Sequence, residues 1–342
     1  MKQVTVVIGD WQTDYFGRSF SLSSSKIKLI DVAIQNRSIS RNLWFLRELP
    51  KLANQLKPDI IHLSFPFPII RRWFNAPIVA TIHDLYPFEY PQNFGYPQVW
   101  FNQGFLRQCV DQSDGLSCVS QVTLDSLKLH FPKLQDRKPL KVIYNSVDFS
   151  NKLSNLSSRL TDFSDKPFIL GVAQHRKNKN LNLLIQAYHR LRESGNISAN
   201  IQLLLVGSPG PETQALHGLV QSLHLNSKVT FLSGLSDEEL RWMYEQAELF
   251  VMPSSTEGFC LPLVEAQTLG CPIVCSNIPI FHEIASPYCH FFSLENTPIS
   301  NLTQAIYKAI SKPKNRQSFV NSSFLSSTVA QQYLNLYQLV SA

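Results

Sequence analysis

The stretch STEGFCLPLVEAQTLGCPIV, residues 255–274, carries two glutamates eight positions apart, Glu257 and Glu265. Pro262 lies between them, and Gly270 follows the second glutamate. Proline suits the first turn of a helix, where no backbone N–H is needed, and glycine suits the residue that ends one. The sequence therefore predicts a short helix that begins near Pro262 and stops at Gly270.

The apolar run LFVMPS, residues 249–254, precedes this helix and is typical of a strand. The loop over residues 254–260 then leaves the carboxyl end of that strand, where ligands bind in open parallel sheets. Free N–H groups at the start of the helix favour a phosphate. Glu257 and Glu265 would repel a diphosphate, so we expect them to face a cation or a neutral, hydroxylated group such as a sugar or a ribose.

Short apolar runs alternate with amphipathic segments along the chain, as in a doubly wound parallel sheet. In the first half we expect strands at residues 3–10, 58–65, 76–84, 115–120 and 141–148. Helices are expected at 121–131 and at 41–57, which Pro50 should kink or split. A long, aromatic-rich connection covers residues 85–113.

The second half repeats the alternation. We expect strands at residues 168–174, 201–208, 228–234, 249–254 and 272–277, and helices at 181–195, 211–225, 236–247, 303–310 and 322–340. Ser236 and Glu239 have the spacing of a capping box, which marks the start of a helix.

A polar, serine-rich segment separates the two series. The fold class expected is α/β, with two Rossmann-like, doubly wound parallel-sheet domains facing a cleft. The first domain would cover residues 1–150, a linker 151–166 and the second domain 167–315. Residues 316–342 are expected to form a helix that packs back toward the first domain.

The composition is that of a globular protein, with 342 residues, 44% hydrophobic residues and a net charge of +6. The positive charge favours an anionic substrate or an anionic membrane surface, or is simply spread over a solvated surface. The six cysteines form no CxxC pair and are expected to be buried thiols rather than metal ligands. No signal peptide and no apolar run of roughly 18 residues is seen, so we expect a cytoplasmic location.

Several motifs of other function classes are missing from the sequence. It has no GxGxxG dinucleotide fingerprint, no GxxxxGK[ST] phosphate loop, no GxSxG elbow and no HExxH metal motif. No stripe of basic and aromatic residues indicates nucleic acid.

A basic cluster follows the first strand of the second half, at His175, Arg176, Lys177 and Lys179. Cations in a loop between strand and helix can clamp a diphosphate by charge and hydrogen bonds. The alternative is a solvated basic loop without a ligand.

Motifs along the chain resemble those of one known family. VATIHDLYPFEYP, KVIYNSVD, GVAQHRKNKNLNLLIQAY and EGFCLPLVEAQTLGCP fall in the expected order, over roughly residues 58–285. Together they resemble the GT-B-fold retaining glycosyltransferases of family 4, also called group 1. The two glutamates with seven residues between them are the most specific part of this resemblance.

The resemblance implies a site for a nucleoside diphosphate sugar. Its catalytic residues would be His83, which reaches the donor sugar from the first domain, Glu257, which contacts that sugar, and Lys179, which binds phosphate. The other implied donor-binding residues would hold the ribose, the phosphates, the sugar and the base: Arg176, Asn145, Gly207, Leu235, Gly258, Phe259, Cys260, Leu261 and Glu265. Among these, Glu265 would bind the ribose hydroxyls.

Three positions depart from the family pattern. Gln174 stands where the family often has an arginine, and Arg176 would supply that charge from another backbone position. Cys260 stands where a glycine is usual, which puts a side chain close to the sugar unless it points away. The first loop usually has a double glycine, and here it has only Gly17.

The implied reaction moves a sugar to an acceptor hydroxyl with retention of configuration and without a metal or other cofactor, in polysaccharide, lipopolysaccharide or glycolipid assembly. The acceptor would bind the first domain. Arg71, Arg72 and the aromatic residues of 86–105 would face a lipid-linked sugar at a membrane, or are ordinary packing. The alternatives are a non-catalytic carbohydrate-binding or scaffold relative, a GT-B nucleotide-sugar epimerase and a periplasmic-type sugar-binding protein.

Overall fold

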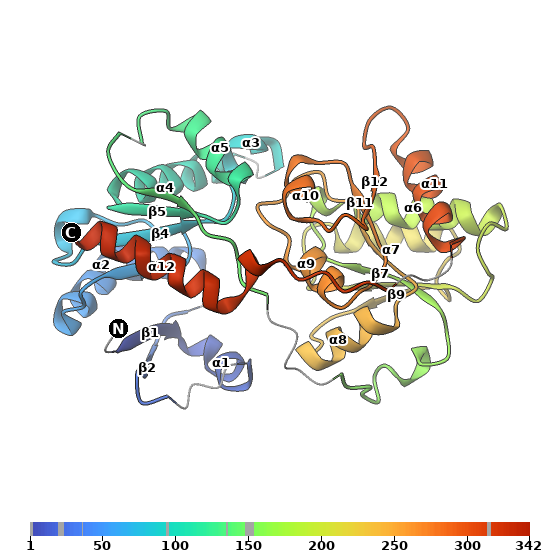
Figure 1. Cartoon of the computed structure of the whole chain (residues 1–342), viewed down its shortest axis with the longest axis horizontal. Coiled ribbons are helices and arrows are strands. Elements are labelled where there is room, and N and C mark those ends of the chain that lie inside the picture. Colours follow the sequence, from blue (N-terminus) through green and yellow to red (C-terminus); the bar gives the residue numbers. More distant parts are fainter. Residues whose placement is uncertain are drawn as a thin grey trace.

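The computed structural model describes residues 3–19, 24–35, 37–93, 96–134, 136–147, 154–312 and 316–342. It shows two α/β halves side by side, joined a second time by the last helix, which returns to the first half (Figure 1). The predicted linker lies partly outside the described residues, at residues 151–153.

Six parallel strands form the sheet of the second half, in the order β12-β11-β10-β7-β8-β9. Their bounds are β7 Phe168–Val172, β8 Gln202–Val206, β9 Val229–Leu232, β10 Leu249–Met252, β11 Ile273–Ser276 and β12 His290–Phe292. Successive strand residues point to opposite faces, and the neighbours Ile169 and Leu170 lie in two different buried clusters. Both faces of the sheet are therefore buried, which explains why the sequences of these strands are continuous apolar runs.

The helices of the second half follow the predicted alternation. They are α6 Leu181–Glu193, α7 Thr213–Ser222, α8 Asp237–Gln246, α9 Leu261–Thr268, α10 Pro279–Ile284 and α11 Pro298–Ile310. The capping box of α8 is confirmed: the Glu239 N–H donates to Ser236 Oγ at 3.2 Å, and the Ser236 N–H donates to Glu239 Oε2 at 2.8 Å. The sequence did not predict α10 and β12, which have six and three residues and are too short to show a period.

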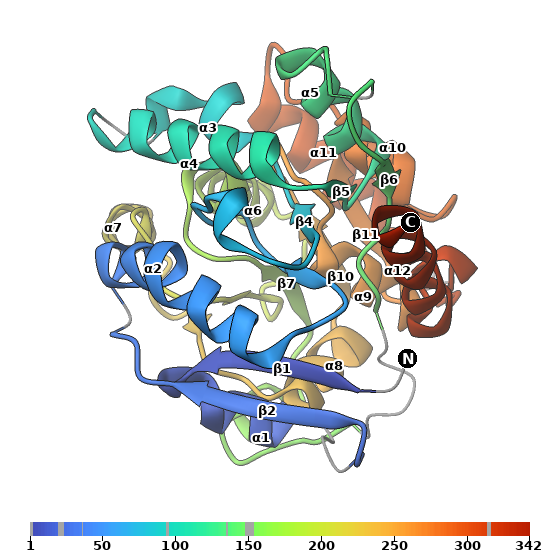
Figure 2. The same ribbon diagram turned by 90° about the vertical axis from the view of Figure 1, so that its left-hand side faces the viewer.

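In the first half the described residues form two parallel sheets where one was expected. The larger sheet has the order β3-β4-β5-β6, with β3 Ile61–Leu63, β4 Ile78–Ile82, β5 Gly115–Cys118 and β6 Leu140–Val142. The separate pair is β1 Val4–Gly9 and β2 Ile27–Val32 (Figure 2). β2 was not predicted because Lys28 and Asp31 interrupt its apolar residues.

The helices of the first half are α1 Thr13–Ser19, α2 Ser38–Leu56, α3 Tyr86–Glu89, α4 Gln98–Gln112 and α5 Gln121–His130. α2 runs through Pro50 without a break, so of the two predicted effects the split is wrong, and the kink stays a prediction. Leu49 and Ala53 pack on the first-half core and hold the helix on both sides of the proline. The aromatic-rich connection is largely helical, as α3 and α4.

Short 3-10 turns connect several of these elements: η1 Asp10–Gln12, η2 Arg71–Trp73, η3 Pro91–Asn93, η4 Thr161–Phe163, η5 Lys177–Lys179 and η6 Ser322–Phe324. Among the described helices, none combines the length and the apolar character that crossing a bilayer requires.

The last helix, α12 Ser326–Ser341, packs on the four-stranded sheet of the first half (Figure 2). Val329 and Leu336 of α12 share a buried cluster with Val79 of β4. Tyr337 bonds through its hydroxyl to His62 Nδ1 at 2.6 Å. The preceding segment lies on the second half, since the Phe319 N–H donates to the Gln267 carbonyl at 2.9 Å. The chain therefore crosses between the halves twice.

Candidate functional site

The loop after β10 leads into α9 as the sequence predicted. α9 begins at Leu261 with Pro262 in its first turn, and Gly270 follows its end with φ +66°. The residue that caps its start is Cys260, whose φ of +83° lies in the left-handed region. That region strains a residue with a β-carbon, so the backbone at this position favours glycine.

Two donors hold the Glu257 carboxylate at one oxygen. Lys179 Nζ lies 2.5 Å from Glu257 Oε1, and Ser254 Oγ donates to the same oxygen at 2.7 Å. Burial lowers the pKa of Lys179, but the charge of Glu257, the hydrogen bond to it and the nearby Cys260 together outweigh burial and leave that pKa above its usual value. Two of the three implied catalytic residues thus form an ion pair, which joins the loop after β7 to the loop after β10.

Two asparagines fasten the same two loops, Asn178 through its main-chain carbonyl and Asn180 through its side-chain amide. The Ser255 N–H donates to the Asn178 carbonyl at 2.8 Å, and Asn180 Nδ2 donates to the Pro253 carbonyl at 2.9 Å. No sequence motif indicated Asn178 or Asn180 as site residues. Their position beside Lys179 in a loop after a strand is the only signal that would have pointed to them.

Glu265 has a different partner from Glu257. The buried Tyr244 hydroxyl, on α8, donates to Glu265 Oε2 at 2.9 Å. Burial, and then the charge of Glu265, raise the pKa of Tyr244 well above its usual value, so the tyrosine stays a hydrogen-bond donor. The two glutamates therefore have different neighbours: Glu257 lies against a cation and a serine hydroxyl, and Glu265 accepts from a tyrosine hydroxyl.

The basic cluster divides between exposed and buried residues. Arg176 and Lys177 are exposed. His175 is buried, its Nδ1 lies 2.9 Å from Thr213 Oγ1, and burial followed by the charge of His217 lowers its pKa. A neutral, buried His175 is a structural residue, which leaves Arg176 and Lys177 as the accessible cations beside Lys179.

Gly258 of the second half lies directly against the main chain of His83 in the first half. A β-carbon on Gly258 would lie 1.6 Å from the His83 carbonyl oxygen, so no side chain fits there. Thr123 Oγ1 also donates to the Gly258 carbonyl, at 3.3 Å. The His83 ring is held by its own half: Nε2 lies 2.8 Å from the Ser64 carbonyl oxygen, and the ring stacks on Phe65 at 5.7 Å.

Asp84 is a further residue at this junction that the sequence analysis did not assign. A β-carbon on Gly258 would lie 3.4 Å from the Asp84 β-carbon. Water reaches Asp84, but the surrounding protein desolvates its carboxylate and raises its pKa, and the charge of Glu257 adds to this while Arg176 opposes it. Its place directly after His83, at the carboxyl end of β4, is the sequence signal that could have found it.

Phe259 and Cys260 turn their side chains into the core of the second half. The Phe259 ring meets Phe324 at 5.3 Å in a T-shaped contact, and Leu261 is 41% exposed. The Cys260 thiol is buried, and burial followed by the charge of Glu257 raises its pKa well above the usual value. The departure at Cys260 thus places a thiol in the core rather than toward the junction between the halves.

The remaining predicted residues lie in loops of the same region. Gly207 directly follows β8, where a β-carbon would lie 1.9 Å from the Ala173 carbonyl oxygen, so this close approach requires glycine. Leu235 is half-buried against the core of the second half, and Asn145 is half-buried after β6. Gln174 Nε2 donates to the Pro209 carbonyl at 3.4 Å, whereas Gly17 lies in α1, where a β-carbon would meet no neighbour.

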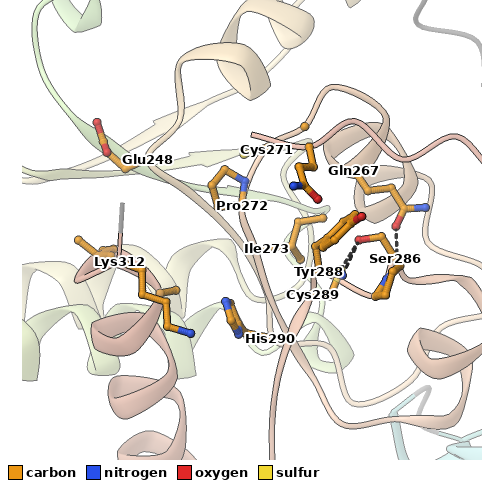
Figure 3. Close-up of a pocket in the computed structure, with 15 residues that line it drawn as sticks. Glu248, Gln267, Cys271, Pro272, Ile273, Ser286, Tyr288, Cys289, His290 and Lys312 are labelled. Atoms are coloured by element: carbon orange, nitrogen blue, oxygen red, sulfur yellow. Dashed lines mark hydrogen bonds between the residues drawn. The ribbon is translucent and has the colours of Figure 1, made fainter. Parts of the chain in front are cut away.

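A cavity of about 370 Å³ lies elsewhere, at the amino ends of β11 and β12 (Figure 3). Ile273, Tyr288, His290 and Lys312 line it, and none of the predicted site residues does. Burial and the charge of Lys312 lower the pKa of His290. Ligands of parallel sheets bind at the carboxyl ends of strands, so this cavity is not the candidate site.

Sequence families cover both halves of the chain. The family described as "Glycosyltransferase Family 4" matches residues 3–151, and the family described as "Glycosyl transferases group 1" matches residues 155–324. The boundary between the two matches falls within the serine-rich segment.

Similar proteins include two from bacterial O-antigen synthesis. The O-antigen biosynthesis glycosyltransferase WclY of Escherichia coli is 30% identical over 314 residues, which are 85% of this chain and 82% of that protein. The O-antigen chain mannosyltransferase RfbU of Salmonella typhimurium is 31% identical over 239 residues, 70% of this chain. That match spans 61% of the length of the Salmonella protein, less than two thirds.

Solved structures share the fold at lower identity. WaaG, a glycosyltransferase involved in lipopolysaccharide biosynthesis, has a TM-score of 0.67 at 17% identity and covers 98% of this chain and 97% of its own. HepE of Anabaena, in complex with UDP and glucose, has a TM-score of 0.65 at 17% identity, with 98% of this chain and 90% of that one covered. These likenesses show a GT-B fold. From the family matches and the relative from Escherichia coli, this chain belongs to the group 1 glycosyltransferases of family 4.

Proposed function

We propose that this protein transfers a sugar from a nucleoside diphosphate sugar to an acceptor hydroxyl, with retention of the anomeric configuration. The observation that carries the proposal is the Lys179–Glu257 pair, 2.5 Å apart, which joins the loop after β7 to the loop that leads into α9. The pair sets a cation and a carboxylate side by side beside a helix N-terminus. A diphosphate needs the cation and the N–H groups, and a sugar hydroxyl needs the carboxylate.

In this proposal the departing diphosphate carries the negative charge that develops in the transition state. Lys179, Arg176 and the N–H groups at the start of α9 stabilise that charge, and fixed positive groups of this kind contribute most when they are already in place. The donor phosphate takes the proton from the acceptor hydroxyl on the face that it leaves, which retains the configuration. No metal ion or other cofactor takes part in the proposed reaction.

The remaining residues hold the donor in the proposed complex. Glu265, kept in position by Tyr244, accepts hydrogen bonds from the ribose hydroxyls. His83 and Asp84 reach the donor sugar from the first half, because both follow β4 and lie against Gly258. Glu257 accepts a hydrogen bond from the sugar while Lys179 turns to the phosphate.

A transfer assay with a panel of UDP-, GDP- and ADP-sugars tests the function. We expect one donor to release its nucleoside diphosphate, and Lys179→Ala to lower kcat by about 10²-fold, as loss of one charge-stabilising group does. Lys177→Ala is the matched control, since Lys177 is an exposed cation in the same loop and should change little. Absence of both binding and transfer with every donor would refute the proposal.

We also propose a place in the assembly of a surface polysaccharide or lipopolysaccharide, with a saccharide acceptor carried on a lipid. The names of the relatives from Escherichia coli and Salmonella support this.

The proposed location is the cytoplasm, with contact to the inner face of a membrane. Exposed aromatic residues of the first half support that contact: Tyr96 is 72%, Trp100 64% and Phe101 61% exposed.

Arg71 belongs to the packing of the first half rather than to a membrane surface. Its Nε lies 2.6 Å from Asp114 Oδ2, and its Nη1 donates to the Phe74 carbonyl at 2.8 Å. The membrane test therefore uses Trp100→Ser with Phe101→Ser, and sedimentation with vesicles that contain an anionic lipid. We expect the double variant to remain in the supernatant, and equal sedimentation with the wild type would refute the membrane contact.

A further inference from the structure

A carboxylate of the second half binds the start of a helix of the first half. Glu283 lies on α10, and α10 contacts α5 across the boundary between the halves (Figure 1). The Gln121 N–H donates to Glu283 Oε1 at 2.6 Å, and the Val122 N–H donates to Glu283 Oε2 at 3.0 Å. Both carboxylate oxygens are thus used by main-chain donors of the other half.

These two N–H groups belong to the first turn of α5, where no carbonyl of the helix can accept them. The next N–H in line, that of Thr123, donates to Ser120 Oγ at 3.0 Å, which is an ordinary cap from within the same half. A negative charge at this end also interacts favourably with the helix dipole. Glu283 therefore completes the cap of α5 from outside its own half.

Tyr144 lies beside the same carboxylate. It follows β6 in the first half and packs against the core of the second half. Burial, and then the negative charge of Glu283, raise the pKa of Tyr144 to about 12. The tyrosine therefore remains a neutral hydroxyl at neutral pH and adds no repulsion to the contact.

The capped end of α5 also touches the loop that precedes α9. Thr123 Oγ1 lies 3.3 Å from the Gly258 carbonyl oxygen and 3.5 Å from the His83 carbonyl oxygen. The start of α5 thus bridges the residues that follow β4 and the loop that holds Glu257. A shift of α5 relative to α10 would move His83 away from that loop.

We propose that Glu283 is a positioning residue that sets the register between the two halves. By binding two N–H groups of α5, it places His83 and Asp84 opposite Gly258 and Glu257. The contact is reversible, because water replaces the carboxylate at the helix start when the halves separate. The kinetic part of this proposal rests on the proposed function, whereas the structural part does not.

Two pairs of variants separate this role from a general loss of stability. Glu283→Ala removes the carboxylate, and Glu295→Ala is its control, since Glu295 is an exposed carboxylate elsewhere in the second half. Gln121→Pro removes one donor N–H at the first residue of α5, where helices accept proline. Ser120 is extended, with φ −159° and ψ +164°, as a residue before proline must be.

Gln121→Ala is the control for the proline variant. The Gln121 side chain donates to Asp125 Oδ1 at 2.7 Å, so both substitutions lose that bond, but only the proline loses the N–H to Glu283. In the Glu283→Ala background, Gln121→Pro and Gln121→Ala should give the same radius of gyration and the same kcat, because the carboxylate that accepts the Gln121 N–H is already gone.

Small-angle X-ray scattering without ligand, calorimetry with UDP and GDP, and the transfer assay provide the readouts. We expect Glu283→Ala and Gln121→Pro to increase the radius of gyration and to lower kcat about tenfold, equivalent to about 1.4 kcal/mol, with unchanged nucleotide affinity. The proposal would be overturned if Gln121→Pro and Gln121→Ala had the same radius of gyration and the same kcat. It would also be overturned if Glu283→Ala had the radius of gyration of the wild type. If the wild type binds no nucleotide, the proposed function fails, and the radius of gyration alone decides the role of Glu283.

Discussion

Glu257 Oε1 accepts hydrogen bonds from both Lys179 and Ser254, and the side chains of Glu257 and Lys179 are only 9% and 20% exposed. Glu257→Gln leaves the Lys179 ammonium without its counter-charge. We expect a loss of roughly 2 kcal/mol in the free energy of unfolding, measured by urea denaturation. Adding Lys179→Met should restore part of it, because replacing both charges is less costly than stranding one. A double variant less stable than Glu257→Gln would contradict this pairing.

Cys260 combines a left-handed backbone with a buried thiol. Cys260→Gly and Cys260→Ala both lose the thiol packing, but only glycine releases the strain of roughly 1–2 kcal/mol that the left-handed region imposes. We therefore expect the glycine variant to have the higher melting temperature. At positions without a left-handed backbone, alanine is more stable than glycine by roughly 0.5–1 kcal/mol. A Cys260→Ala variant that is more stable than Cys260→Gly would therefore show that Cys260 is not strained.

Asp84 has a pKa that the folded protein raises, first by desolvation. Its charged form is thus disfavoured in the folded state, and the stability of the protein falls as pH rises through the range above its unfolded pKa. We expect Asp84→Asn to stabilise the protein at pH 7, while Asn still accepts the N–H of Tyr86. The gain should vanish near pH 4 in thermal denaturation, and a gain that persists at low pH would contradict the assignment.

At the scale of elements, α12 is joined to the first half through His62 of β3. Its Nδ1 lies 2.6 Å from the Tyr337 hydroxyl and its Nε2 2.8 Å from Thr81 Oγ1. Burial, followed by the charge of His83, lowers the pKa of His62 to about 4. Unfolding then takes up a proton, so the stability should fall as pH drops from about 6.5 toward 4.

Thermal denaturation between pH 7 and pH 4.5 measures this dependence. His62→Gln keeps a polar side chain without a titrating ring and should have a flatter profile than the wild type. A variant with the same slope as the wild type would show that other groups cause the acid sensitivity.

The elements that the sequence predicted best have signals within a few residues. Ser236 and Glu239 cap α8 as their spacing indicates, and Pro262 and Gly270 bracket α9. β2 was missed because its apolar residues are interrupted, and α10 because a helix of six residues shows no periodicity. The sequence predicts elements whose start and end residues carry local signals. It does not predict elements that depend on packing against other parts of the chain.

In the candidate site, too, the sequence predicts local features but not contacts between distant residues. The loop of Glu257 and the start of α9 follow from local signals, but the pairing of Glu257 with Lys179 joins residues 78 positions apart. The capping of α5 by Glu283 joins residues more than 160 positions apart. No spacing rule indicates such contacts, because the packing of whole sheets and halves creates them.

At the scale of the whole molecule, the two halves meet where Gly258 lies on the His83 carbonyl. Gly258→Ala would place a β-carbon 1.6 Å from that oxygen, so the halves must move apart. Because a misplacement of about 1 Å can cost 10²-fold in rate, we expect a loss of kcat of that order. Gly218→Ala is the control, since a β-carbon there, on α7, meets no neighbour. Equal activity of Gly258→Ala and the wild type would contradict the contact.

The proposed function requires that the second half bind the nucleoside diphosphate of a sugar donor at the loop before α9. Calorimetric titration with UDP and with GDP tests it most directly, using the wild type, Lys179→Ala and Glu265→Ala. We expect one nucleotide to bind the wild type and each variant to bind it at least about tenfold more weakly, a loss of about 1.4 kcal/mol. Wild-type protein that binds neither nucleotide, or variants that bind as tightly as the wild type, would contradict it.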